Sequence, residues 1–121
     1  MTDKVLILVT APSRREARKI ARHLVEARLA ACVNLSQPIQ SIYRWEGKVQ
    51  EDKEFLLHIK STRDLFPEVR KAIQNTHSYK IPEIICLPIV DGSPEYLSWV
   101  GESVKPPAPI ESIAPGKEQK A

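Results

Sequence analysis

The sequence is poor in cysteine, glycine and aromatic residues, and each shortage excludes a class of protein. It has 2 cysteines and 4 glycines in 121 residues, with 6% aromatics. Cys32 and Cys86 form no C-x-x-C motif, which removes the usual dithiol site of redox proteins and metal chaperones. There is no glycine-rich phosphate loop, no G-x-S-x-G elbow and no cysteine beside a histidine. We therefore expect no catalysis.

The charge balance and the short apolar runs argue against two further kinds of partner, nucleic acids and membranes. Eighteen lysines and arginines against 15 acidic residues give a net charge of +3, far from the concentration typical of nucleic-acid or membrane-surface proteins. The first apolar run, residues 5–10, is too short for a membrane span and lacks a signal-peptide cleavage site. Both cysteines lie in apolar runs and are expected to be buried and reduced. The predicted location is the cytoplasm.

The first quarter of the chain predicts a strand followed by a helix. Residues 5–9 are an uninterrupted aliphatic run, the pattern of a central strand. Ser13 with Glu16 three residues later forms a capping box, and apolar residues then recur at helical spacing over residues 13–28. These segments predict a buried strand packed against an amphipathic helix.

A long β-hairpin is predicted over the middle of the chain. Extended runs over residues 30–45 and 49–62 are separated by a three-residue turn around Gly47. At about 3.3 Å per residue the first run would reach roughly 50 Å, about twice the length of the preceding helix, and Pro38 predicts a bend within it. Such arms leave backbone groups unpaired in a single chain. We therefore expect the hairpin to join the subunits of an oligomer.

The second half of the chain predicts a helix, a strand and a short final helix. Residues 63–75 have one apolar helical face, residues 83–90 indicate a strand with an interior proline, and Pro94 starts the last helix. The order β-α-β-β-α-β plus a terminal helix is α+β and ferredoxin-like, with one antiparallel sheet and two helices on one face. We expect one domain over residues 1–104 and a flexible, proline-rich tail over residues 105–121.

Five ordered blocks of sequence resemble the CutA divalent-cation tolerance family. The blocks are LAACVN at 29–34, SIYRWEGK at 41–48, KST at 60–62, HSYKIPE at 77–83 and YLSW at 96–99. The match covers about residues 4 to 102 and leaves only the tail outside it. The resemblance implies a ferredoxin-like subunit, a homotrimer, and an association with copper and other divalent cations. It also implies a likeness in architecture to the trimeric nitrogen-signalling PII proteins.

The same resemblance implies a metal site in the loop before the last strand. Copper binding in the family is attributed to a cysteine at the end of the first strand, a histidine in this loop and a glutamate after its proline. His77 and Glu83 match the last two, whereas Val9 stands where the thiol would be. A sparse nitrogen and oxygen site for copper or another divalent cation is thus implied. The residues leave another interpretation open, in which His77 caps a helix and Glu83 bonds loop backbone.

Aromatic residues offer a further candidate site. A cleft around Lys60 as an anion-binding group could be lined by Trp45, Tyr79 and Tyr96, together with Tyr43 and Trp99, because aromatic walls around one charge are a common small-ligand arrangement. Packing between subunits explains the same residues, since aromatics bury large areas at interfaces while a polar tip stays hydrogen-bonded. A cleft between subunits would satisfy both interpretations. No organic cofactor is expected.

Nucleic-acid binding is the weakest of the functions considered. A basic ridge on the first helix, formed by Arg15, Arg18, Lys19 and Arg22, is a solvated polar face more often than a phosphate contact. The RNA-recognition motif has the same element order, but residues 54–60 lack its aromatic signature. The leading hypothesis is a non-enzymatic homotrimer that binds a metal ion or small ligand in clefts between subunits and takes part in copper tolerance. The alternative is a PII-like signalling or interaction scaffold with indirect metal effects.

Overall fold

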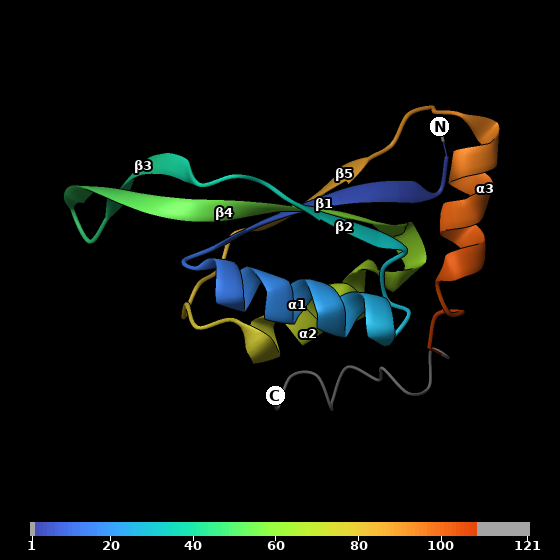
Figure 1. The fold of residues 1–121 in the computed structure, drawn as a ribbon, viewed down its shortest axis with the longest axis horizontal. Coiled ribbons are helices and arrows are strands. Elements are labelled where there is room, and N and C mark those ends of the chain that lie inside the picture. The colour runs from blue at the N-terminus through green and yellow to red at the C-terminus, as the bar shows by residue number, and fades with distance from the viewer. Residues whose placement is uncertain (1, 109–121) are drawn as a thin grey trace.

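An antiparallel sheet with two helices packed on one face forms the body of the molecule (Figure 1). The computed structural model describes residues 2–108. The strands are β1 (Lys4–Ala11), β2 (Cys32–Leu35), β3 (Ile39–Trp45), β4 (Lys48–Thr62) and β5 (Ile84–Pro88). The helices are α1 (Arg14–Glu26), α2 (Phe66–Thr76), which follows the 3-10 turn η1 (Arg63–Leu65), and α3 (Pro94–Ser103). The α+β, ferredoxin-like order is confirmed, and β2 and β3 are the two parts of the first hairpin arm.

The central strands bury one face of the sheet. The strand order is β2-β4-β1-β5, so β1 has a neighbour on both sides. Alternate β1 residues from Val5 to Val9 are buried, as are Leu57 and Ile59 of β4 opposite them, against the apolar faces of α1 and α2. Burial of each such aliphatic side chain stabilises the fold by about 1.5–3 kcal/mol. This face therefore determines which side of the sheet the helices cover.

Local signals in the sequence position α1. The Ser13 hydroxyl accepts the Glu16 backbone N–H at 3.1 Å, which confirms the N-cap. The Glu16 carboxylate does not complete the expected capping box in the described structure, because it accepts the backbone N–H of Ser78 at 2.8 Å. Beyond α1 the chain reverses direction through Arg28, whose φ is 59°. A carboxylate at the start of α1 thus holds the distant loop that carries the candidate metal ligands.

Strand β4 is the longest element and extends beyond the helices. Its 15 residues correspond to about 50 Å, against about 20 Å for the 13 residues of α1. Residues 55–62 pair with β1, whereas the described partner of residues 48–54 is β3 alone. We call residues 39–54 the arm, which projects past α1 and α2 in Figure 1. The turn at its tip contains two residues rather than the expected three, Glu46 and Gly47, with φ of 50° and 80°.

Apolar side chains are exposed on both faces of the arm. Ile42 and Val49 lie on one face, and each is 64% exposed. Tyr43 and Trp45 lie on the other face and are 39% and 43% exposed. An isolated two-stranded ribbon is at best marginally stable in water. Contiguous exposed apolar groups of this kind are typical of interaction surfaces.

The helix-free face of the sheet carries further exposed apolar groups. Ile85 and Leu87 of β5 are exposed. Helix α3 stands across one end of the sheet rather than over its centre (Figure 1). It buries Val100 but leaves Tyr96 and Trp99 exposed. Exposed apolar side chains therefore lie on the arm, on β5 and on α3.

The first residues of the predicted tail contact the helix layer. The Lys105 ammonium forms an ion pair with the Glu68 carboxylate at 2.9 Å, and the Ala108 N–H donates to the same carboxylate at 2.9 Å. The Lys105 N–H donates to the carbonyl of Arg28 at 2.9 Å. Residues 105–108 are thus attached to the domain, and the rest of the segment predicted to be flexible lies outside the described residues.

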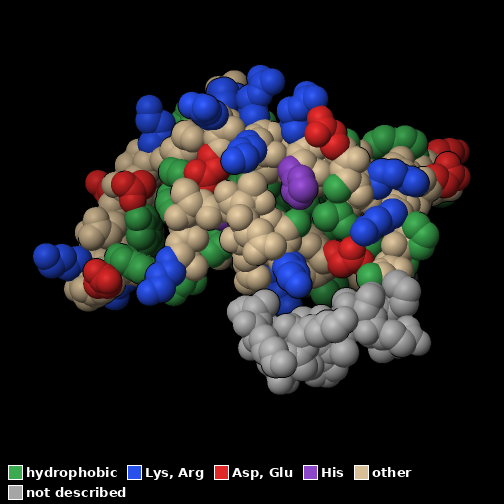
Figure 2. All heavy atoms as spheres, turned by 90° about the horizontal axis from the view of Figure 1, so that it is seen from below, with side chains coloured by type: hydrophobic (Ala, Val, Ile, Leu, Met, Phe, Trp, Pro, Cys, Tyr) green, Lys and Arg blue, Asp and Glu red, His purple; other side chains and the backbone are tan. Residues whose placement is uncertain are grey.

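The helix-bearing face is polar. Figure 2 shows lysine and arginine side chains spread over it, with acidic side chains between them. The residues of the α1 ridge are exposed, and one of them, Arg22, pairs with Glu26 at 2.7 Å. Exposed pairs of this kind contribute little to stability. Within residues 2–108, no helix is long and apolar enough to cross a membrane.

Candidate functional site

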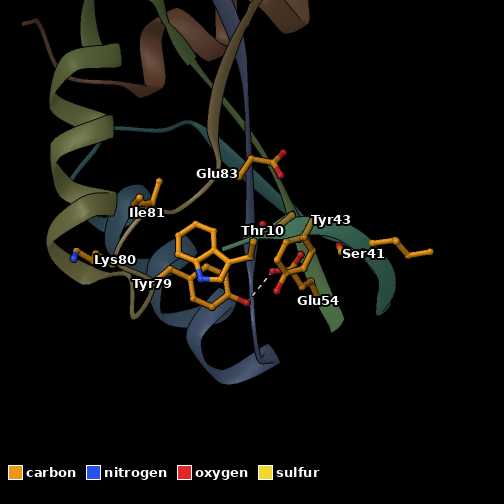
Figure 3. Close-up of a pocket in the computed structure, with 10 residues that line it drawn as sticks. Thr10, Ser41, Tyr43, Glu54, Tyr79, Lys80, Ile81 and Glu83 are labelled. Atoms are coloured by element: carbon orange, nitrogen blue, oxygen red, sulfur yellow. Dashed lines mark hydrogen bonds between the residues drawn. The ribbon is translucent and has the colours of Figure 1, made fainter. Parts of the chain in front are cut away.

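A pocket opens on the helix-free face of the sheet, where the arm leaves the body (Figure 3). Its volume is about 570 Å³. The residues that line it are Thr10, Ser41, Ile42, Tyr43, Trp45, Glu54, Tyr79, Lys80, Ile81 and Glu83. Strand register explains the grouping: Ser41 and Tyr43 share an arm face with Glu54, and Thr10 pairs with Leu56 on the same face of β4.

The loop between α2 and β5 forms one wall of the pocket and is fixed by His77. The His77 side chain is fully buried. Its Nε2 donates to the Thr10 carbonyl oxygen at 2.7 Å, because a carbonyl can only accept. Its Nδ1 lies 3.0 Å from the Tyr79 backbone N–H and 3.2 Å from the Glu16 carboxylate. Both ring nitrogens are therefore engaged by protein groups.

Two tyrosine–carboxylate pairs face the pocket. The Tyr79 hydroxyl donates to Glu54 Oε2 at 2.8 Å, and the Tyr43 hydroxyl donates to Asp52. Burial, followed by the hydrogen bond to Glu54, raises the pKa of Tyr79. The hydrogen bond to Asp52, followed by burial, raises the pKa of Tyr43. Both phenols therefore remain protonated donors, and the carboxylates give this wall a negative charge.

Alkaline titration should show these environments directly. The pKa is raised for Tyr43, Tyr79 and also Tyr96, the three tyrosines of the chain. Ultraviolet absorbance should therefore show tyrosinate forming above the ordinary pKa of about 10 in the folded protein. Because the fold favours the neutral phenol, its stabilisation is fully present below about pH 10 and is lost as the pH rises through the folded pKa values. Glu54→Gln should lower the pKa of Tyr79 part of the way. Three tyrosines titrating together near pH 10 in native protein would contradict the prediction.

The structure separates the two candidate metal ligands. Glu83 is exposed and lines the pocket, where Figure 3 shows its carboxylate. His77 lies at the end of α2 and is buried. Within residues 2–108, no three histidine, cysteine or acidic side chains are grouped so as to hold a metal ion. Val9, at the position of the family thiol, is fully buried in the core. Any metal site that uses Glu83 therefore needs further ligands.

The residues considered for a small-ligand cleft lie in different places. Tyr43, Trp45 and Tyr79 line the pocket. Lys60 is not among its lining residues, and its ammonium donates to Asn34 on β2. Tyr96 lies on α3, with its ring centroid 5.6 Å from that of Trp99. A single chain therefore does not bring Lys60 to the aromatic wall.

The two cysteines do not form a common site. Both are free, and in the single chain each is partly buried rather than buried as expected. Cys32 pairs with Lys60 on β4, whereas Cys86 pairs with Ile7 on β1, which points to the helix layer. These register positions place the two thiols on opposite faces of the sheet. Cys32 lies on the helix-free face and Cys86 lies on the edge strand β5, which is consistent with their partial exposure.

Sequence reasoning missed the acidic side of the pocket. Glu54 is only 6% exposed, although it lies in the polar start of the second hairpin arm. The signal was the strand register: a two-residue turn at Glu46 and Gly47 places Glu54 opposite Ile39, on the face of Tyr43. The contact between Glu54 and Tyr79, 25 positions apart, depends on tertiary folding.

Comparisons with known proteins point to one family. The family model described as CutA1 divalent ion tolerance protein matches residues 5–103. The divalent-cation tolerance protein CutA of Thermus thermophilus is 49% identical over 98 residues, which cover 81% of this chain and 95% of that protein. Human Protein CutA is 47% identical over 92 residues, or 76% of this chain. The match covers 51% of the human protein, so the chain spans about half the length of that relative.

Solved structures agree with this match over the same part of the chain. The divalent cation tolerance protein from Thermus thermophilus superposes with a TM-score of 0.83 at 47% identity, covering 84% of this chain and 99% of that one. The periplasmic divalent cation tolerance protein CutA from Archaeoglobus fulgidus gives a TM-score of 0.82 at 43% identity, with the same coverage of 84% and 99%. Fold and sequence therefore lead to the same group of proteins.

Proposed function

The chain belongs to the CutA1 divalent ion tolerance family, and on that premise we propose that it is a non-enzymatic homotrimer that takes part in tolerance of copper and other divalent cations. The observation that carries the proposal is the arm, with Ile42 and Val49 each 64% exposed beyond the helices. Association through the arm would cover these groups and the unpaired strand edges. The pocket at the base of the arm would then lie between subunits.

We further propose Glu83 as a metal ligand at this junction. Its carboxylate is exposed and lines the pocket. His77 is the second candidate, but its imidazole must first leave the Thr10 carbonyl or the Tyr79 amide. Two protein ligands do not define a site for a divalent ion, so a neighbouring subunit would have to supply the others.

Copper titration of the assembled protein tests this proposal. We expect the full-length protein to sediment at about 41 kDa, three times the chain mass of 13.7 kDa, and to release heat on addition of Cu(II). Glu83→Ala should weaken Cu(II) binding about ten-fold or more, because it removes a ligand. Cu(I) should bind less well than Cu(II), since no thiolate is available near Val9.

The control is Glu51→Ala, which removes one exposed arm carboxylate that does not line the pocket. It should leave the copper affinity unchanged. Equal heats for wild type, Glu83→Ala and His77→Ala would rule out this metal site. A mass of about 14 kDa at micromolar concentration would rule out the trimer.

A PII-like interaction scaffold is the second candidate function. The engaged nitrogens of His77 favour it, because they leave Glu83 as the one accessible member of the candidate pair. It predicts a trimer that binds copper with the same affinity in the wild type, the Glu83→Ala variant and the His77→Ala variant. A cytoplasmic location is proposed for either function, supported by the free cysteines Cys32 and Cys86.

A further inference from the structure

We propose that the pocket at the base of the arm binds an organic cation, through an ammonium or guanidinium group. The group would belong to a free small molecule or to a lysine or arginine side chain of a second copy of the chain. The inference goes beyond the proposed function, because such a group forms no coordinate bonds and needs no metal ligand. It rests on the aromatic walls, the buried carboxylate and the charge balance of the pocket.

Three aromatic side chains supply the walls of the pocket. Tyr43 and Trp45 come from the arm, and Tyr79 comes from the loop before β5. The faces of tyrosine and tryptophan rings attract cations, and the attraction is greater where water is excluded. Because the tyrosines remain protonated, their rings and hydroxyls offer neutral, electron-rich surfaces. A cation inside the pocket would therefore be surrounded on several sides.

Glu54 supplies a carboxylate that is already largely removed from water. Its side chain is 6% exposed and accepts the Tyr79 hydroxyl through Oε2. Within the described residues, Oε1 has no hydrogen-bond partner. Every fully buried side-chain oxygen in that part of the chain has a partner, so Oε1 is not fully buried. Oε1 is therefore accessible, and Glu54 lines the pocket. A largely buried carboxylate with a free oxygen favours a cation strongly.

The charge balance favours a cation over the anion that the sequence suggests. Glu83 also lines the pocket, and Asp52 bonds the Tyr43 hydroxyl beside it. The basic residue of the lining is Lys80, which is exposed, and Figure 3 shows its ammonium turned away from Glu54. Lys60, the expected anion-binding group, is not part of the lining. Nearby negative charge also contributes to the raised pKa of Tyr79.

The size of the pocket suits a small organic cation. Its volume of about 570 Å³ lies within the range of about 300–1,000 Å³ typical of small-molecule sites. Tetramethylammonium is a suitable probe because it cannot coordinate or donate a hydrogen bond. tert-Butanol provides a neutral probe of similar shape, and sodium chloride controls for ionic strength.

The test is a fluorescence titration of the full-length protein in a Trp99→Phe background. The chain has two tryptophans, so this variant leaves Trp45 in the pocket wall as the reporter. Tetramethylammonium should change Trp45 fluorescence saturably, whereas tert-butanol should not. Glu54→Gln keeps the acceptor for Tyr79 but removes the charge, and should weaken binding about ten-fold. The matched variant Glu26→Gln removes an exposed charge on α1, away from the pocket and the arm, and should leave binding unchanged.

The outcomes separate the two sources of the cation. Saturable binding that depends on Glu54 supports a free organic cation. If no probe binds but Glu54→Gln, unlike Glu26→Gln, makes the assembly dissociate at about ten-fold higher protein concentration, the cation is a side chain of a second copy. Equal responses to the charged and neutral probes, with no effect of Glu54→Gln on association, would overturn the proposal. If the chain is monomeric, the proposed homotrimer is refuted. The fluorescence titration would still test the proposal of organic-cation binding.

Discussion

Replacing Ile42 with lysine and Val49 with glutamate should convert the assembled protein into monomers that keep their fold. The new charges lie on one face of the arm, where Ile42 is opposite Glu51 and Val49 is opposite Arg44. Each substituted residue thus faces an opposite charge across the hairpin, which supports the ribbon within one chain. In the assembly the same charges would be buried against a neighbour. Each desolvated group costs about 1–3 kcal/mol. Two substitutions in each of three chains give six groups, which weaken a trimer by about 6 kcal/mol or more.

Sedimentation velocity at micromolar concentration measures the change. The expected mass falls from about 41 kDa to 13.7 kDa, with a circular dichroism spectrum like that of wild type. Val25→Lys is the matched control, because Val25 is an exposed aliphatic residue, 41% exposed, in the last turn of α1 and away from the arm. A cation is well placed at that helix end. If the arm variant stays as large as wild type, the arm is not the joining surface.

The parts of the fold that local patterns determine could be predicted from the sequence. The aliphatic run of β1, the Ser13 cap and the break at Pro38 each act over a few residues, and the structure confirms all three. Errors arose where two patterns competed. Glu16 has the spacing of a capping box, but the Ser78 amide is a partner that only the folded chain provides. Val25 continues the helical apolar period, yet it is 41% exposed in the last turn of α1.

The candidate site was less predictable because it depends on contacts between distant segments. Family resemblance selected His77 and Glu83, but the burial of one and the exposure of the other follow from how the loop crosses the end of β1. In the single chain, Trp45 and Tyr79 line the same pocket, and their role in ligand binding stays a prediction. The charged group beside them in the single chain is Glu54 rather than Lys60, and the role predicted for Lys60 in a cleft between subunits stays a prediction. A one-residue difference in turn length decides which strand residues face the pocket, because it moves every side chain of the strand to the opposite face of the sheet.

Replacing His77 with alanine should lower the free energy of unfolding by about 2–4 kcal/mol. The substitution leaves the Thr10 carbonyl and the Tyr79 N–H without their partners, at about 1–3 kcal/mol for each buried group left unsatisfied. It also removes a ring whose centroid lies 4.8 Å from that of Tyr79. Urea unfolding followed by circular dichroism measures the loss. His23→Ala, at an exposed position on α1, should change stability by no more than about 0.5 kcal/mol.

His77→Gln separates a structural role for this residue from metal binding. The glutamine amide can donate to the Thr10 carbonyl in place of Nε2, so about half of the lost stability should return, whereas the imidazole ligand is absent. If copper affinity follows stability across the alanine and glutamine variants, His77 acts by holding the loop that carries Glu83. If His77→Ala and His77→Gln lose copper affinity equally, and Glu83→Ala loses the same amount, the imidazole itself is a ligand. In that case the ring must leave the Thr10 carbonyl or the Tyr79 amide when the metal binds, and the loop must move with it.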